Sequence, residues 1–256
     1  MLESWLTPEA VLIIMAGFAA GTVNTVVGSG SLLTFPILLG LGYPPVLANV
    51  SNTIGLLPGS ISGSYGYRRE LRGQGERIWR LGLISAIGGT AGALLLLALP
   101  ATSFEAVVPI LIGVACVVVI VQPRLTRAVR SRSPRSNPAS MHPTVPVVVA
   151  GTSIYGGYFG AAQGVILIAM LGVLVDDHPQ RLNALKNVLT AILNAAASLV
   201  FIVATTVAWE ATVPLAAGAI IGGQSGARIA SRLDPALLRG AIVAIGLIVI
   251  VRYALQ

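Results

Sequence analysis

The stretch Gly21-Thr-Val-Asn-Thr-Val-Val-Gly28-Ser-Gly-Ser31-Leu-Leu-Thr-Phe-Pro36 places a helix break inside a long apolar segment. The surrounding run of 58 residues, from Ala10 to Tyr67, contains no Asp, Glu, Lys or Arg, which is typical of chain buried in a bilayer. Each glycine nevertheless disfavours a helix by about 1 kcal/mol relative to alanine. Non-helical backbone at membrane depth has to be buried in protein or to line a cavity. Residues 28–31 are therefore predicted to separate two half-helices and to offer free backbone N–H groups.

The composition indicates an all-α polytopic membrane protein. Of the 256 residues, 55% are hydrophobic and 10% are charged, with a mean hydropathy of +0.86, whereas a soluble domain carries about 25% charged residues. The segments lack the alternation of a membrane β-barrel. A single cysteine, Cys116, excludes a disulfide framework. The net charge of +7 comes from arginines between apolar segments, which fits the positive-inside rule and argues against nucleic-acid binding.

Glycine, proline and charge divide the chain into helices and one basic connector. Helices are predicted over 10–27, 32–41, 46–67, 81–99, 105–122, 182–207, 211–231 and 236–254, with a stretch at 145–175 that glycines interrupt at 156–157 and 161–164. Residues 123–143 hold five arginines, no acidic residue and several Ser and Pro, which predicts a flexible connector. The expected organisation is a first transmembrane repeat (1–122), a basic cytoplasmic linker (123–143) and a second transmembrane repeat (144–256).

The two halves are predicted to be an internal repeat with an offset of about 134 residues. Gly17 matches Gly151, and Gly30 matches Gly164, at this offset. The segments 88–93 and 222–227, both beginning Gly-Gly, match at the same offset, and Asn52 matches Asn187 at 135.

The distribution of basic residues favours one of two topologies. If each glycine-broken stretch is a hairpin that enters and returns, each half has a hairpin plus three transmembrane helices, and the second half is inverted relative to the first. This arrangement is a common plan of secondary transporters. It places the N- and C-termini outside and the linker inside, with Arg252 as the one basic residue at the outer side. In the competing model each broken stretch is a single crossing, which moves Arg228 and Arg232 to the outer side; the hairpin model is preferred.

Candidate ligand-binding residues in the first half are neutral hydrogen-bond donors beside the break. They are Asn24, Gly28, Ser29, Gly30 and Ser31, followed by Asn49, Asn52 and Thr53 on one face of the next helix. Free amides at the start of a half-helix favour an anion. The alternatives are close packing through small residues, as in the glycine spacings at 88–92 and 218–226, and interhelical hydrogen bonding by the asparagines.

In the second half, Lys186 is predicted to lie one turn inside the membrane. It is interpreted as a fixed positive charge that attracts an anion, or as a lysine that snorkels to the inner surface. Further candidates are Tyr158, Gln163, Gly164, Asn187 and Asn194.

Several kinds of chemistry have no support in the sequence. No Asp or Glu lies deep in a predicted crossing, so a carboxylate proton relay is not expected. The sequence has no Walker loop, HExxH or G-x-S-x-G motif. We therefore expect no enzyme activity, no cofactor and no metal site.

Four motifs of the first half resemble the TauE/SafE sulfite exporter family: Gly17-Phe18-Ala-Ala-Gly21, Gly28-Ser-Gly-Ser31-Leu-Leu-Thr-Phe-Pro36, Ala48-Asn-Val-Ser-Asn-Thr53 and Pro58-Gly59-Ser60-Ile-Ser-Gly63. The segments Gly160–Gly164, Lys186-Asn187 and Gly222-Gly223 are similar too, though less distinctive. The resemblance covers nearly the whole chain and implies an inner-membrane transporter of small sulfur-containing anions. Here Gly28-Ser-Gly-Ser31 stands where a glycine-richer run is common in the family, and its hydroxyls would influence substrate preference.

The expected function is secondary, non-ATP transport of sulfite, thiosulfate or organosulfonates such as sulfoacetate. Access alternates around a midplane site between the repeats. The alternatives are a passive anion channel and a non-transporting membrane scaffold. The expected partners are the sulfur anion, the lipid bilayer and, in a homo-oligomer, further copies of the chain. The expected location is the cell inner membrane.

Overall fold

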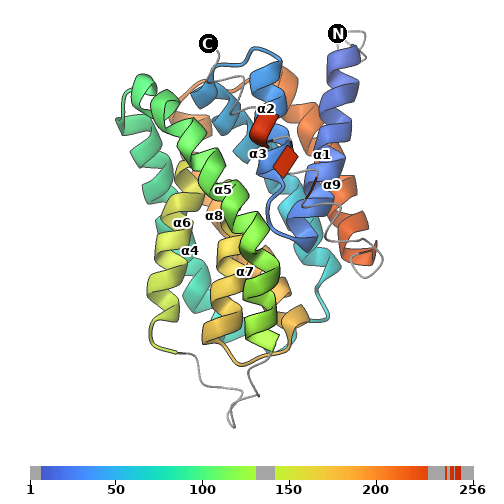
Figure 1. The fold of residues 1–256 in the computed structure, drawn as a ribbon, viewed down its shortest axis with the longest axis vertical. Helices are drawn as coiled ribbons and strands as arrows, with labels where there is room; N and C mark the ends of the chain where they lie inside the picture. Colours follow the sequence, from blue (N-terminus) through green and yellow to red (C-terminus); the bar gives the residue numbers. More distant parts are fainter. Residues whose placement is uncertain (1–6, 131–141, 230–239, 241–242, 245, 249–256) are drawn as a thin grey trace.

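A computed structural model describes residues 7–130, 142–229, 240, 243–244 and 246–248, and its long elements are helices (Figure 1). In chain order they are α1 (Pro8–Val26), α2 (Ser31–Gly40), α3 (Pro45–Gly66), α4 (Gly75–Ala98), α5 (Ala101–Arg130), α6 (Val145–Tyr158), α7 (Gln163–Leu174), α8 (Pro179–Ala204) and α9 (Trp209–Ile229). The all-helical architecture predicted from the composition is confirmed. Four helices are long and apolar enough to cross a membrane: 8–26, 75–98, 101–124 and 179–204.

Each glycine-broken stretch folds as a hairpin of two short helices. The amide of His142, before α6, donates to the carbonyl of Leu174, the last residue of α7, at 3.4 Å, so both open ends of this hairpin lie together. At the open end of the hairpin α1–α2, Tyr43 follows α2 and hydrogen-bonds Glu210 at the start of α9. Burial, and then the nearby carboxylates of Glu210 and Glu9, raise the pKa of Tyr43. The two hairpins enter from opposite ends of the molecule (Figure 1).

The helix starts follow the predicted repeat spacing. Helices α3 and α8 begin at residues 45 and 179, and α4 and α9 begin at 75 and 209, so both pairs are 134 residues apart. The hairpin of each half packs on the other half: α1 lies along α9, and α6 lies along α4. Small residues permit this close approach, as where Gly21 meets Ala219 and where Gly92 meets Gly157. The glycine spacings at 88–92 and 218–226 therefore serve packing.

Three helix boundaries differ from the predicted ones. Helix α5 does not end at Pro123 but continues to Arg130 with this proline inside it, so the start of the predicted linker is helical. Helix α4 begins six residues before 81, where Glu76 and Arg80 form an ion pair at i, i+4 that suits a helical turn outside the apolar segment. Helix α6 runs through Gly156–Gly157, and the break falls at 159–162. The predicted last helix, 236–254, lies mostly outside the described residues.

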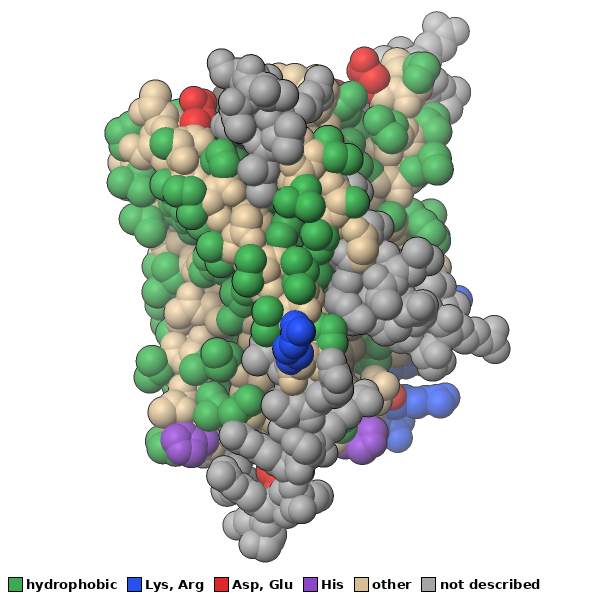
Figure 2. Space-filling model, viewed as in Figure 1, with side chains coloured by type: hydrophobic (Ala, Val, Ile, Leu, Met, Phe, Trp, Pro, Cys, Tyr) green, Lys and Arg blue, Asp and Glu red, His purple; other side chains and the backbone are tan. Residues whose placement is uncertain are grey.

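The outer surface has the polarity expected of a bilayer-spanning bundle. Large apolar side chains cover the flanks, including Met15, Ile87, Ile110 and Val203, all more than 60% exposed. In Figure 2, Lys and Arg gather toward the lower end, and acidic side chains stand out at the upper end.

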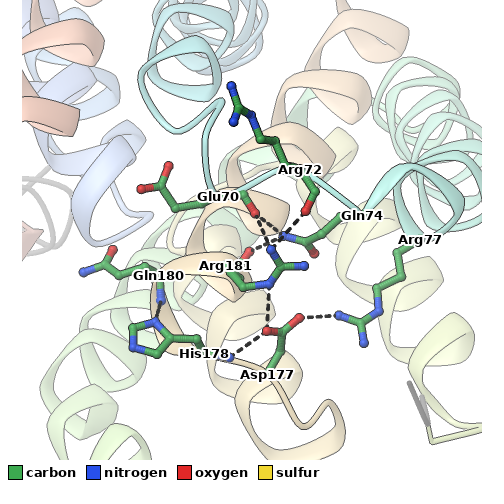
Figure 3. A network of polar contacts seen from close by, with 8 residues as sticks. All are labelled: Glu70, Arg72, Gln74, Arg77, Asp177, His178, Gln180 and Arg181. Atoms are coloured by element: carbon green, nitrogen blue, oxygen red, sulfur yellow. Dashed lines mark hydrogen bonds and ion pairs between the residues drawn. The ribbon is translucent and has the colours of Figure 1, made fainter. Parts of the chain in front are cut away.

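An ion-pair network joins the two halves at the lower end (Figure 3). Asp177, between α7 and α8, accepts from Arg77 of α4 at 2.6 Å and from Arg181 of α8 at 2.9 Å. Arg181 also donates to the backbone carbonyls of Glu70 and Arg72 in the loop between α3 and α4. The loop of one half is therefore tied to the hairpin exit of the other.

Candidate functional site

The two helix breaks touch each other in the middle of the bundle. A Cβ atom on Gly28 would lie 2.6 Å from the carbonyl carbon of Gly164, and one on Gly164 would lie 2.7 Å from Cα of Gly28. Gly28 also has a φ of +94°, in a region that other L-residues rarely adopt. The breaks of the two halves therefore cross glycine to glycine, and a side chain at either position would separate them.

Two half-helices begin at this crossing. Neither α2, capped by Gly30, nor α7, capped by Ala162, has a side-chain capping hydrogen bond. Among the described residues, the amides of Ser29, Gly30 and Ser31 donate no hydrogen bond, and neither do those of Ala161, Ala162 and Gly164. Helix N-termini carry about half a positive charge each, and unpaired amides there bind anions.

A small pocket lies beside the crossing and takes its walls from both halves. Its lining residues are Asn24, Ser31, Asn52, Thr53, Leu56, Gly156, Phe159, Gly160, Gln163, Thr190 and Asn194. None of these is charged, so the electropositive features at the pocket are the starts of α2 and α7, at Ser31 and Gln163. Among the described residues, no His, Cys, Asp and Glu side chains cluster as a metal would require.

Gln163 presents an unpaired donor at this pocket. Its side-chain Oε1 accepts from the Thr190 hydroxyl at 3.3 Å, which fixes the amide orientation. Its Nε2 is buried and has no hydrogen-bond partner. A buried donor without an acceptor costs about 1–3 kcal/mol, which an anion or a water molecule in the pocket would recover.

Lys186 does not line the pocket; it binds the end of the first half-helix. It is buried, with 1% of its surface exposed, and its Nζ donates to the carbonyl oxygens of Asn24 at 2.9 Å and Thr25 at 3.4 Å. Asn183 and Asn187 donate to the same Thr25 carbonyl, each at 3.2 Å. The last carbonyls of a helix lack intrahelical partners, so three side chains of α8 cap the C-terminus of α1.

A related contact caps the second half-helix. Asn49 of α3 donates to the carbonyl of Tyr158, the last residue of α6, at 2.9 Å. Asn49 and Asn183 are 134 residues apart, so the two halves use the same position for this purpose. Ser31 crosses between the breaks and donates to the carbonyl of Gly160 at 3.1 Å.

The structure sorts the predicted residues into two groups. Asn24, Ser31, Asn52, Thr53, Gln163 and Asn194 line the pocket, whereas Gly28, Ser29, Gly30, Asn49, Tyr158, Gly164, Lys186 and Asn187 surround it without lining it. Five lining residues were not predicted: Leu56, Gly156, Phe159, Gly160 and Thr190. Thr190 was predictable from its position one turn from Lys186 and Asn194 on one helix, but the two apolar residues carry no signal in the sequence.

These features define a multi-pass helical membrane protein with a neutral polar pocket between two broken-helix hairpins, a construction found in transporters. The family model described as sulfite exporter TauE/SafE matches residues 13–253, and the chain belongs to this family of membrane transporters.

Relatives over most of the chain have transporter descriptions. A "probable membrane transporter protein" of Haemophilus influenzae is 24% identical over 91% of this chain and 89% of its own length. The "probable membrane transporter protein YfcA" of Escherichia coli K12 is 26% identical over 91% of this chain and 84% of its own. "Probable membrane transporter protein ORF9" of Sinorhizobium is 28% identical over 95% and 89%. No solved structure matches the chain.

Proposed function

We propose that this protein is a secondary transporter of small sulfur-containing anions, such as sulfite, thiosulfate or sulfoacetate, and that the pocket beside Gln163 is its binding site. The observation that carries the proposal is the meeting of two half-helix starts at a neutral pocket with an unpaired buried donor. Neutral donors and helix dipoles suit an oxyanion in a site of low dielectric constant. The family description supports a sulfur oxyanion as cargo.

The proposed transport cycle is alternating access by an inverted repeat in the cell inner membrane. The supporting observations are the 134-residue spacing of the helix starts and the opposite entry of the two hairpins. The proposed orientation places the N- and C-termini outside and the linker 123–143 in the cytoplasm, because arginines of the described part gather at the linker end.

Binding is tested by thermal unfolding of the purified protein with sulfite, thiosulfate, sulfate and sulfoacetate. A ligand at one hundred times its Kd stabilises the folded state by about 2.7 kcal/mol. Gln163→Leu should reduce the anion-induced shift at least tenfold in ligand concentration. The control is Ser85→Ala, which removes a buried hydroxyl of α4 outside the pocket and should keep the wild-type shift. Equal shifts in both variants would place the anion elsewhere.

Transport is tested with labelled sulfite in liposomes. A carrier should give saturable uptake that is accelerated by unlabelled anion inside the vesicle. Ohmic currents without this acceleration would indicate a passive channel instead. If none of the sulfur anions binds or moves, the proposed function is wrong.

A further inference from the structure

We propose that Lys186 is a positioning residue for the anion site: its ammonium group holds the C-terminal end of half-helix α1 and thereby places Asn24 and the Ser29–Ser31 amides. This role differs from direct attraction of the anion. It rests on the proposed function only for the affinity measurement described below.

The contacts of Lys186 are made with backbone and not with the pocket. Both of its acceptors are carbonyl oxygens of the last turn of α1. The C-terminus of a helix carries about half a negative charge, so it is a suitable partner for a buried ammonium group in a site without carboxylates. The lysine is thus electrically committed to α1.

Asn24 connects this cap to the pocket. Its backbone carbonyl accepts from Lys186, while its side chain lines the pocket and donates to the Ser60 hydroxyl at 3.2 Å. The unpaired amides of Ser29–Ser31 follow within seven residues. A shift of the end of α1 would therefore move both a lining side chain and the start of α2.

The comparison of the two halves isolates what the charge adds. Asn49 and Asn183 cap the two half-helices from equivalent positions. The residue equivalent to Lys186 in the first half is the uncharged Asn52, which lines the pocket. The ammonium group is thus an addition, in one half only, to a capping contact that both halves share.

A double-mutant cycle separates positioning from direct binding. Lys186→Met should weaken sulfite binding at least tenfold, measured by thermal shift and by KM for uptake. In an Asn24→Ala background the same change should cost less than threefold further, because positioning acts partly through Asn24. An equal loss in both backgrounds would show that the lysine contacts the anion directly and would overturn the proposal.

A measurement without any anion keeps the inference separate from the proposed function. Ser31→Cys, in a Cys116→Ser background, reports the pocket geometry through its rate of reaction with a small thiol reagent. Adding Lys186→Met should change this rate at least fivefold, whereas Ser198→Ala, at a buried α8 position outside the cap, should change it less than twofold. Equal rates with and without the lysine would overturn the proposal.

A second variant covers the case in which Lys186→Met does not fold. Lys186→Gln retains a donor for the Asn24 carbonyl. It should keep a Ser31→Cys reaction rate closer to that of the wild type than to that of Asn183→Ala/Asn187→Ala. A Gln variant no closer to the wild type than this doubly uncapped protein would contradict positioning by the cap.

Discussion

Gly28 meets two requirements at once. Its φ of +94° needs a residue without a Cβ, and its Cα lies against the backbone of Gly164. Gly42 has a similar φ of +89°, but a Cβ atom added there would meet nothing within 4 Å. The pair therefore separates the cost of backbone conformation from the cost of crowding.

Gly28→Ala should lower the free energy of unfolding by about 3 kcal/mol or more, through both left-handed strain and overpacking. Gly42→Ala should cost only about 1 kcal/mol, from the backbone term alone. Thermal unfolding in one detergent compares them. Equal losses would mean that the crossing of the breaks has no energetic role.

Residue-level prediction from the sequence had a clear limit. The break at 28–31 was predictable because Gly-Ser-Gly-Ser is a poor helix inside an apolar run. The partner of Lys186 was not predictable: its acceptors lie 161 and 162 residues away in the sequence and are backbone atoms, which leave no signature in residue type.

At the scale of elements, glycines at equivalent repeat positions have different surroundings. A Cβ on Gly17 would meet the Leu215 carbonyl, because α1 packs on α9 there. Gly151, 134 residues later on α6, has nothing within 4 Å. The repeat therefore preserves the residue but not its packing role.

Gly17→Ala should destabilise the protein by about 2 kcal/mol, since helix backbones would have to separate. Gly151→Ala should stabilise it by about 0.5–1 kcal/mol, because alanine favours a helix more than glycine does. Unfolding temperatures of the two single variants check the opposite signs. Destabilisation by Gly151→Ala would show that this position is packed in the folded protein.

Element boundaries were predictable where apolar runs end and less so elsewhere. The starts of α3 and α8 lie within three residues of their predictions, since Pro44–Pro45 and Pro179 mark them. Pro123 was wrongly taken as a stop, because proline inside a long helix removes one hydrogen bond without necessarily ending the helix.

At the scale of the whole molecule, the network around Asp177 fastens the lower end of the two halves. Asp177 and Arg77 have side chains only 11% and 17% exposed, whereas the surface pair Glu76–Arg80 is 76% and 67% exposed. The first pair also bridges different halves, so its removal should affect the assembly of the bundle.

Asp177→Asn should lower the free energy of unfolding by about 2 kcal/mol, because it removes a carboxylate shared by two guanidinium groups. Glu76→Gln, which breaks the exposed pair, should cost less than about 0.5 kcal/mol. Thermal unfolding at low and high salt measures both. A loss for Asp177→Asn as small as that of the control would show that the network does not hold the halves together.

The proposed orientation is tested with single cysteines in a Cys116→Ser background. Ser103→Cys, at the exposed start of α5, should react with a membrane-impermeant maleimide added outside intact cells. Thr144→Cys, beside the linker, should react only after the membrane is opened. The reverse pattern would invert the proposed topology.

The packing of α1 on α9 has a consequence for biosynthesis. Thr22 hydrogen-bonds the carbonyl of Gly222, which lies 200 residues further along the chain. At roughly 5–20 residues per second, the ribosome needs about 10–40 s to make the partner of the first helix. During that interval the glycine face of α1 must be covered by lipid or by an insertion chaperone, so newly made protein is most vulnerable before its final third has been translated.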